Sequence, residues 1–408
     1  MDIPQGYKQT ELGVIPDDWD VKKLGEIAVV SSGGTPNRSN PFYWNGNIPW
    51  ITTSQIDFNT IISSNEFITE LGLQNSAAKL YDQNTLLMAM YGQGKTRGKV
   101  AILGIDATIN QACAAISLNK DVSNDYVLFY LAHNYEEIRK LSNTGNQENL
   151  NGNIIKSIFV PLPPLPEQKA IAQSLSDVDA LITAIDKLIT KKRNIKQGAM
   201  QELLTGKKRL PGFTGDRDVK NFGDLVVVRK QKIDPRKEGR QPFCVELEHI
   251  KQGGGQLIGY SETTSKSSIK TIFCKDDILF GKLRAYLRKY WLADRGGVAS
   301  TEIWPLVARF DVVLPEYIYQ LIQTDSFIES ASISYGTHMP RTDWNVIKTY
   351  SILLPPLPEQ KAIAQILSDM DAEIERLEKT REKYKLIKRG IMQELLTGKT
   401  RLKHQLDP

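Results

Sequence analysis

A block of 48 residues occurs twice in this chain, at residues 163–210 and again at 355–402. Aligned without a gap, the two copies are identical at 32 of the 48 positions, at a constant offset of 192 residues. Repeats that stack into solenoids have periods of about 20–50 residues, whereas this offset leaves room for a whole domain between the copies. The chain is therefore predicted to follow the order domain, helix, domain, helix.

Each copy of the block predicts one long helix. It opens with prolines, runs without a helix breaker over 166–204 or 358–396, and ends at a Thr-Gly pair. Proline in the first turn and glycine just past the last are typical helix boundaries. Apolar residues recur at spacings of three and four, which is typical of a coiled-coil seam. The predicted seam consists of Ile171, Leu175, Val178, Ile182, Ile185, Ile189, Ile363, Leu367, Met370, Ile374 and Leu377.

The two helices are predicted to pair with each other. A helix of 39 residues is about 58 Å long, which is more than the width of a domain of this size, although packing of each helix on its own domain is the alternative. The first helix leaves the first domain and enters the second, and the second helix runs back, so the pair is expected to be antiparallel. The predicted boundaries are 1–160, 161–210, 211–352 and 353–408.

The two globular parts are predicted to be small mixed α/β (α+β) domains. Each contains short β-type runs between Gly, Asn, Asp and Ser clusters, such as 108–117, and helical stretches, such as 126–141. The two parts begin alike, with Asp-Val-Lys-Lys-Leu-Gly-Glu-Ile at 20–27 and Asp-Val-Lys-Asn-Phe-Gly-Asp-Leu at 218–225. Elsewhere they diverge, so a duplicated frame is expected to carry two different inserts.

Composition places the chain among ordinary cytoplasmic proteins. It is 41% hydrophobic and 24% charged, and no apolar run reaches membrane-spanning length. The N-terminus has neither the basic nor the apolar region of a secretion signal. The three cysteines, Cys113, Cys244 and Cys274, have no Cys-x-x-Cys spacing, which argues against a disulfide framework or a zinc site.

Charge separates the two inserts. Residues 229–289 hold 14 Lys and Arg against 7 Asp and Glu, whereas residues 1–160 hold 12 against 16. The basic stretch, with aromatic residues among the bases, predicts a surface for a polyanion such as DNA, and a solvated basic face is the alternative. In the first insert only local clusters of basic and amide side chains remain. The candidate DNA-binding residues are Arg38, Gln55, Gln93, Lys95, Arg97, Lys99, Lys230, Lys232, Arg236, Lys237, Lys282, Arg284, Tyr286, Arg288, His338 and Arg341.

Three motifs that would indicate an enzyme are incomplete. Gly94-Lys95-Thr96 resembles the end of a phosphate-binding loop, but a strand rather than a helix is predicted to follow it. The segment 40–43, Asn-Pro-Phe-Tyr, lacks the second proline of the adenine-binding loop of amino-methyltransferases. The four histidines are isolated, and no catalytic or metal-binding spacing is present. We therefore expect no catalysis and no metal in this chain.

The duplicated Pro-Pro-Leu-Pro-Glu-Gln-Lys-Ala-Ile-Ala and Met-Gln-Glu-Leu-Leu-Thr-Gly-Lys, with the segments 11–19 and 277–284, resemble the specificity subunits of type I restriction-modification systems. The resemblance implies two target-recognition domains, each reading one half of a bipartite DNA site, and a helix pair that acts as a spacer. It also implies two methyltransferase subunits docked on the helices, and restriction subunits in the same complex. S-adenosylmethionine, ATP and Mg²⁺ are then expected on those partners, with no cofactor in this chain.

Two other classes of function compete with this interpretation. A coiled-coil regulator would bind an operator without partners. An interaction scaffold would have no role on DNA.

Overall fold

The computed structural model describes residues 3–92, 94–141, 149–333 and 340–402. The chain divides into two compact units, the first formed by residues 1–184 and 381–408 and the second by residues 185–380. Each unit contains one globular domain and a part of each long helix. None of the helices in the described ranges is both long and apolar enough to cross a membrane.

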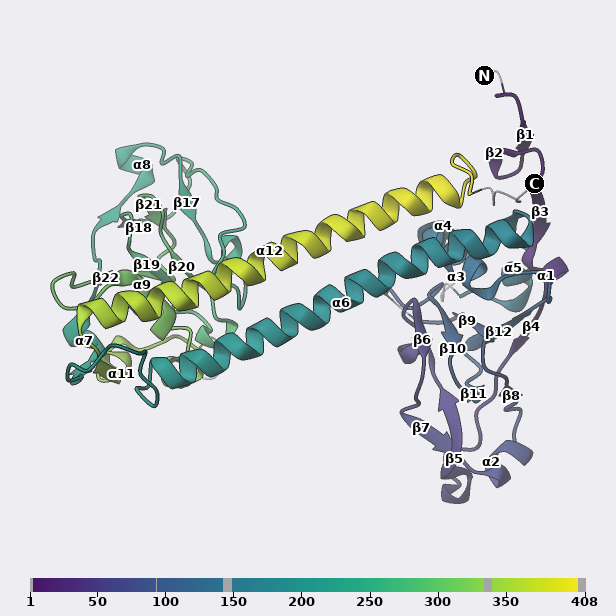
Figure 1. Ribbon diagram of the computed structural model, residues 1–408, viewed down its shortest axis with the longest axis horizontal. Coiled ribbons are helices and arrows are strands. Elements are labelled where there is room, and N and C mark those ends of the chain that lie inside the picture. Colours follow the sequence, from purple (N-terminus) through teal and green to yellow (C-terminus); the bar gives the residue numbers. More distant parts are fainter. Residues whose placement is uncertain (1–2, 93, 142–148, 334–339, 403–408) are drawn as a thin grey trace. The chain divides into compact units, whose positions relative to one another are not determined.

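Two long helices, α6 (Leu165–Leu203) and α12 (Leu357–Leu395), are formed by the duplicated block (Figure 1). Each begins and ends one residue before the predicted position. The glycine after each helix, Gly206 or Gly398, has a positive φ of 77° or 70°, which closes the last turn in the left-handed conformation that glycine adopts most readily. The Lys208 N–H then donates to the Glu202 carbonyl at 3.1 Å.

Ion pairs inside each unit show that the helices run antiparallel there. In the first unit Lys388 of α12 lies 2.6 Å from Asp179 of α6, and Arg401, which follows α12, lies 2.7 Å from Glu167 nearer the start of α6. In the second unit Lys196 of α6 lies 2.6 Å from Asp371 of α12, and Lys192 lies 2.8 Å from Glu373. Asp179 and Asp371, like Lys196 and Lys388, differ by the repeat offset of 192, so the two halves use the same pair of positions. The predicted antiparallel pairing is thus present within each unit.

In the first unit the domain is built from two main sheets. The strand order of the larger sheet is β4 (Ala28–Ser32), β12 (Cys113–Leu118), β9 (Leu86–Ala89), β10 (Val100–Leu103), β6 (Asn59–Ile61). The order of the smaller sheet is β7 (Glu66–Ile68), β5 (Trp44–Ile51), β11 (Ala107–Ile109), β8 (Leu80–Tyr81). The two-stranded sheets are β1 (Tyr7–Thr10) with β2 (Gly13–Pro16), and β3 (Asp20–Lys23) with β13 (Phe159–Leu162). The short helices are α1 (Leu24–Ile27), α2 (Glu70–Gln74), α3 (Asn124–His133), α4 (Tyr135–Lys140) and α5 (Gly152–Lys156), with 3₁₀ turns η1 (Pro41–Tyr43) and η2 (Thr53–Gln55).

The second unit repeats much of this frame, with two sheets of four strands each. The order of one sheet is β15 (Val226–Val228), β22 (Ile303–Ala308), β19 (Ile278–Gly281), β20 (Tyr290–Leu292). The order of the other is β16 (Lys232–Ile233), β18 (Lys270–Phe273), β21 (Gly297–Ala299), β17 (Cys244–Val245), and β14 (Asp218–Asn221) pairs with β23 (Ser351–Leu354). The short helices are α7 (Phe222–Leu225), α8 (Pro235–Glu238), α9 (Pro315–Leu321), α10 (Asp325–Ser332) and α11 (Trp344–Ile347), with 3₁₀ turns η3 (Leu247–His249) and η4 (Ala285–Leu287). The predicted mixed α/β class with two long helices is confirmed.

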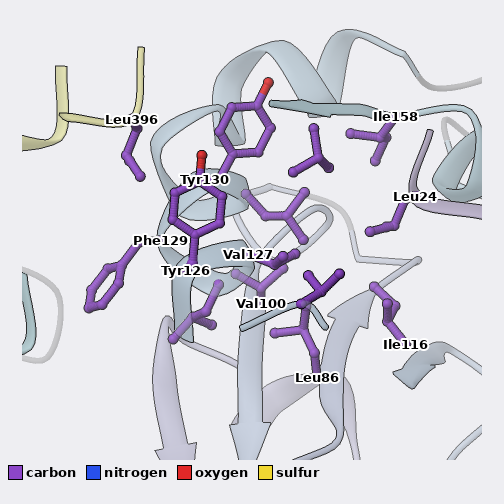
Figure 2. Packing of buried hydrophobic residues seen from close by; sticks show 14 of the residues in the cluster. Leu24, Leu86, Val100, Ile116, Tyr126, Val127, Phe129, Tyr130, Ile158 and Leu396 are labelled. Carbon is purple, nitrogen blue, oxygen red and sulfur yellow. The ribbon is translucent and has the colours of Figure 1, made fainter. Parts of the chain in front are cut away.

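The central strand of the larger sheet in the first unit is buried on both faces. In β9, Leu86 and Met88 pack on one side against α3, while Leu87 and Ala89 pack on the other side against the second sheet. This alternation follows from the two-residue period of a strand, and it explains why the segment is apolar throughout. Figure 2 shows the α3 side of this core, where Leu86 and Val100 lie below the rings of the helix.

The predicted seam residues fall into three environments. Ile171 and Leu175 of α6 belong to the core of the first domain, and Ile363 and Leu367 of α12 belong to that of the second, with Met370 packed against it. Ile185, Ile189 and Ile374 are buried farther along the helices, and Val178, Ile182 and Leu377 are half-buried. The start of each helix therefore packs on its own domain, which was the alternative to a seam running along the whole helix.

A buried glutamine ties each long helix to its domain. The Gln168 side chain accepts a hydrogen bond from the Ser123 N–H at 2.9 Å and donates to the Pro163 carbonyl at 2.8 Å. Its duplicate Gln360 accepts from the Leu314 N–H at 3.0 Å. A buried amide must find partners for both its donor and its acceptor, so the repeated Pro-Glu-Gln sequence has a structural reason in both halves.

Candidate DNA interface

In the first unit Arg38 lies on a platform of two tryptophans. Its guanidinium is 3.9 Å from the ring centre of Trp44 and 4.7 Å from that of Trp50. It also pairs with Glu66, through Nη2 and Oε2 at 3.1 Å and a second, shorter contact. The hydrogen bond from Arg38 lowers the pKa of the Glu66 carboxyl, so the pair is charged and locally neutral. Arg38 is half-exposed but shares its charge with a carboxylate.

Lys95, Arg97 and Lys99 precede β10 in the first unit. Lys99 pairs with Asp57 at 2.5 Å, Lys95 is exposed, and Arg97 is buried, with 6% of its surface exposed. Gln55 donates its side-chain N–H to the Ser63 carbonyl at 3.1 Å. Gln93 lies outside the described residues. This group supplies Lys95 as an exposed cation, but it does not form a basic surface.

The turn at Gly94-Lys95-Thr96 leads into β10, as the sequence predicts, and not into a helix. Without a helix N-terminus, the backbone N–H groups that cradle a phosphate are not supplied.

In the second unit basic side chains gather around a groove of about 790 Å³ beside β15. It is lined by the basic side chains Arg229, Lys230, Lys232 and Lys282, by Thr271 and Thr301, and by Trp304 and Trp344, together with apolar residues of β15 and β22. The two tryptophan rings meet edge to face with their centres 5.8 Å apart. The groove combines positive charge, hydroxyl groups and aromatic surface, which is the chemistry that binds a nucleic-acid backbone.

The lysines of this groove differ from its arginine in their ion pairing. Arg229 binds the buried Asp277 with both ends of its fork, at 2.7 and 2.9 Å, which raises the pKa of the guanidinium. Lys230, Lys232 and Lys282, by contrast, form no ion pair with any residue in the described ranges. The charge of Lys282 nevertheless adds to the hydrogen bond from Arg341 in lowering the pKa of the Glu302 carboxyl. Lys230 and Lys232 are therefore the cations of the groove that are most available to an anionic ligand.

The basic loop, residues 282–289, connects β19 and β20. Arg284 and Arg288 have φ values of 55° and 53°, so both are in the left-handed region on either side of the turn η4. For residues other than glycine this conformation costs roughly 1–2 kcal/mol each. Tyr286 between them is 53% exposed. Backbone strain of this kind is concentrated at functional sites, and here it presents a tyrosine and an arginine to solvent.

Three of the remaining basic candidates of the second unit, Arg236, Arg288 and Arg341, have acidic partners. Arg341 binds Glu302 at 3.0 and 3.1 Å, and Arg236 binds Asp234 at 2.8 and 2.9 Å. Arg288 donates to the Gln323 carbonyl at 3.0 Å and pairs with Asp325, while Lys237 is exposed on α8. His338 lies outside the described residues.

Sequence reasoning missed the aromatic and hydroxyl walls of the groove. Trp304 and Trp344 are 40 residues apart, so no local pattern connects them. Trp304 is a half-buried aromatic residue in the otherwise mostly buried strand β22. A large aromatic side chain in that strand was the one feature of the local sequence that could have indicated its role.

Most of the chain matches a known protein family. Residues 16–197 and 216–386 match the family described as "Type I restriction modification DNA specificity domain". The MjaVIII specificity subunit of Methanocaldococcus jannaschii is 25% identical over 98% of this chain and 97% of its own length, and the MjaX specificity subunit of the same organism is 26% identical over the same shares.

Solved structures share the fold. The S subunit of a type I restriction-modification system from M. genitalium aligns with a TM-score of 0.59 at 13% identity, over 97% of this chain and 98% of that one. A second structure, from work on complex assembly of the type I system, aligns with a TM-score of 0.57 at 15% identity, over 95% and 99%. The family match spans both domains and most of both long helices, so this chain belongs to the type I restriction-modification DNA specificity family, which recognises DNA and is not catalytic.

Proposed function

We propose that the two domains of this chain each read one half of a bipartite DNA site, and that the second domain does so through the groove beside β15 and the basic loop. The observation that carries the proposal is the contrast between a shared frame and unlike surfaces. The segment β3–α1–β4 of the first unit has its counterpart in β14–α7–β15 of the second, yet the side chains that follow differ in charge. Two domains that share a frame but differ in their surface side chains are suited to recognising two different DNA half-sites.

In the second domain the lysines and the basic loop have different roles. Lys230, Lys232 and Lys282 contact phosphates, which supply affinity and position without reading sequence. Arg284 and Tyr286, held out by the strained turn, contact base edges in the major groove, where arginine pairs bidentately with guanine.

In the first domain few phosphate contacts come from the chain itself. Arg38 and Lys99 already have acidic partners, so most of the backbone contacts there come from a methyltransferase subunit bound alongside. Amide side chains such as Gln55 then supply base contacts, because glutamine can pair bidentately with adenine.

The long helices have two roles in this proposal. They determine the number of unread base pairs between the half-sites, and they dock two methyltransferase subunits. In the second unit, Leu188 and Ile195 on α6 lie seven residues apart and are 39% and 47% exposed, so they place apolar side chains on one face of the helix. Exposed apolar side chains on a charged helix suit a protein partner.

Chemistry is assigned to the partners. The methyltransferase subunits carry S-adenosylmethionine, and restriction subunits, which join through the complex, carry ATP and Mg²⁺. Within the described part of this chain no cluster of acidic, histidine or cysteine side chains could hold a metal ion.

The test is methylation sequencing of DNA from cells that express this chain with its methyltransferase partner. The expected result is one bipartite motif with a constant spacer. A free chain that binds a defined site tightly without partners would support the operator-binding regulator instead, and a chain that copurifies with no methyltransferase would remove the proposal.

The groove is tested by substituting Lys230→Gln and Lys232→Gln together. Each lost phosphate contact is expected to reduce the slope of log affinity against log salt by about one, without altering the half-site. Arg236→Gln in the same stretch is the matched control, because its guanidinium is already bound to Asp234. An unchanged salt slope in the double variant would place the DNA elsewhere.

A further inference from the structure

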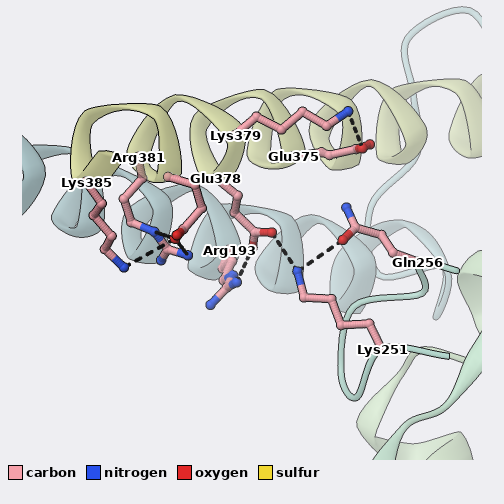
Figure 3. Close-up of polar contacts among 9 residues, drawn as sticks. Arg193, Lys251, Gln256, Glu375, Glu378, Lys379, Arg381 and Lys385 are labelled. Atoms are coloured by element: carbon pink, nitrogen blue, oxygen red, sulfur yellow. Dashed lines mark hydrogen bonds and ion pairs between the residues drawn. The ribbon is translucent and has the colours of Figure 1, made fainter. Parts of the chain in front are cut away.

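The loop 251–256 of the second domain reaches the helix pair. The Lys251 ammonium donates to Glu378 Oε2 of α12 at 2.8 Å and to Gln256 Oε1 at 3.0 Å (Figure 3). The other oxygen of Glu378 is bound by Arg193 of α6. One carboxylate therefore joins both long helices and the domain. Burial raises the pKa of Glu378, but hydrogen bonds from the two cations outweigh it and keep the pKa below its usual value.

The same loop also contacts the basic loop. The Gly253 N–H donates to the Arg288 carbonyl at 3.1 Å, and the Gly255 carbonyl accepts from the Tyr319 hydroxyl at 3.1 Å. Gly253 and Gly255 have φ values of 67° and 60°, and a Cβ at Gly255 would lie 2.1 Å from the Tyr319 hydroxyl oxygen. The close approach to Tyr319 thus depends on the absence of a Cβ at Gly255, and the positive φ values at Gly253 and Gly255 favour glycine there. A chain of contacts runs from Glu378, through the loop, to the left-handed Arg288.

Polar contacts rather than apolar packing hold this connection. A cavity of about 620 Å³ lies between the loop and the helices, lined by Lys251, Arg193, Glu378, Tyr319 and Gln320 among others. The position of the loop beside this space depends on the directional bonds of Lys251, whereas the rest of the domain packs on α6 and α12 through an apolar core that includes Met200 and Ile363.

The first half of the chain is built differently at the related positions. Lys385, the duplicate of Arg193, pairs with Glu382 on its own helix at 3.2 Å. Lys388, the duplicate of Lys196, lies 5.2 Å from the ring centre of Phe129. In the second half Lys196 contacts Gln323 at 3.0 Å instead. In the second unit the long helices therefore contact polar side chains of their domain, such as Gln323 and Lys251, whereas in the first unit Lys388 contacts the ring of Phe129.

We propose that Glu378 is a positioning residue for DNA reading, which fixes the basic loop relative to the helix pair and so determines the spacer lengths that the second domain accepts. This inference rests on the proposed function. Glu378 touches no DNA in this scheme and acts through Lys251 and the backbone of the glycine loop.

The test uses the full chain, coexpressed with its methyltransferase partner, and a DNA library in which the two half-sites are separated by the natural spacer or by one base pair more or fewer. Wild-type chain is expected to direct methylation to one spacer length. Glu378→Gln is expected to raise the methylation of the neighbouring spacer lengths, relative to the natural one, by about tenfold, the effect of losing roughly one charged hydrogen bond. The half-site sequences are expected to stay the same.

Glu375→Gln is the matched control. Glu375 lies one turn away on α12, carries the same charge and pairs with Lys379 of its own helix at 2.7 Å. If Glu375→Gln raised the methylation of the neighbouring spacer lengths as much as Glu378→Gln does, the effect would be an unspecific one of charge, and the proposal would be overturned. So would a Glu378→Gln chain that melts at a lower temperature but keeps the wild-type spacing, because that is the result of a merely structural role.

A second variant reaches the same loop without touching Glu378. Gly255→Ala forces the loop away from Tyr319 and is expected to relax the spacing as well. Adding Tyr319→Phe removes the hydroxyl that the new methyl group would meet, so the double variant is expected to regain part of the selectivity. Unchanged spacing in Gly255→Ala would overturn the proposal even if Glu378→Gln did not fold. Absence of any bipartite motif with wild-type chain would defeat the proposed function instead.

Discussion

Arg401 donates two hydrogen bonds to Glu167, from Nε to Oε1 at 2.8 Å and from Nη2 to Oε2 at 2.7 Å, across 234 positions of the sequence. The duplicate pair, Arg209 and Glu359, repeats this bond, with Nη2 and Oε2 at 2.6 Å. Each long helix therefore begins at a buried carboxylate that is bound by the arginine following the other long helix. This explains why the duplicated block includes both its Pro-Glu-Gln start and its Arg-Leu end.

We expect Arg401→Met to destabilise the first unit by about 3 kcal/mol, because it leaves the Glu167 carboxylate buried without its main counter-charge. Urea denaturation followed by circular dichroism measures the loss. The double variant with Glu167→Gln is the control, since it removes the stranded charge and is expected to recover part of the stability. A single variant as stable as wild type would show that the pair contributes nothing.

Acid is expected to weaken the second unit through Glu359. Burial raises the pKa of this carboxyl, but hydrogen bonds from Arg209 and Arg217 outweigh it and lower the folded pKa below the unfolded value of about 4.3. A lowered folded pKa contributes stability above pH 4.3, and this contribution is lost as the pH falls through the folded value. Glu359→Gln should therefore be less stable than wild type at pH 7, with a difference that shrinks below pH 4. Denaturation midpoints across this range measure it, and a constant difference would contradict the assignment.

Two glycines inside the long helices offer stabilising substitutions. Gly198 and Gly390 are duplicates of each other, and a Cβ at either would meet no atom within 4 Å. Alanine is favoured over glycine in a helix by about 1 kcal/mol, so Gly198→Ala and Gly390→Ala should each raise stability by roughly that amount. Gly398→Ala is the contrast, because its φ is 70° and its Cβ would lie 2.4 Å from Pro16 Cδ. Thermal denaturation measures the effect: the melting temperature should rise in Gly198→Ala and Gly390→Ala and fall in Gly398→Ala. Changes in the same direction in all three variants would refute the argument.

Glu66→Gln is expected to release the charge of Arg38. The guanidinium would stay on Trp44 but lose its carboxylate partner, so one more cation would be available to DNA phosphates. Affinity for DNA should rise at low salt, and the slope of log affinity against log salt should steepen by about one. Salt titrations of the assembled complex measure this. Adding Arg38→Gln is the control and should return the slope to the wild-type value; an unchanged slope in Glu66→Gln would place Arg38 away from the DNA.

Local patterns determined the long helices almost completely. Proline and glycine boundaries and the spacing of apolar residues are properties of a few neighbouring positions, and the predicted ends differ from the observed ones by one residue. The same kind of reasoning failed where one side chain ends an element. The apolar run 108–117 was predicted as a single strand, but Asn110 accepts from the Ala112 N–H at 3.1 Å and turns the chain into a second sheet.

The sequence by itself determined that this protein has two halves on one frame, two long helices and a basic second insert, because duplication, periodicity and charge can be counted along the chain. Only the tertiary structure decided which cations remain available. Arg38 meets Glu66, 28 positions away, and Arg341 meets Glu302, 39 positions away, whereas Lys230 and Lys232 meet no acidic partner in the described part of the chain. Ion pairing depends on distances of a few ångströms between residues that folding brings together, so it could not be inferred from the order of the residues along the chain.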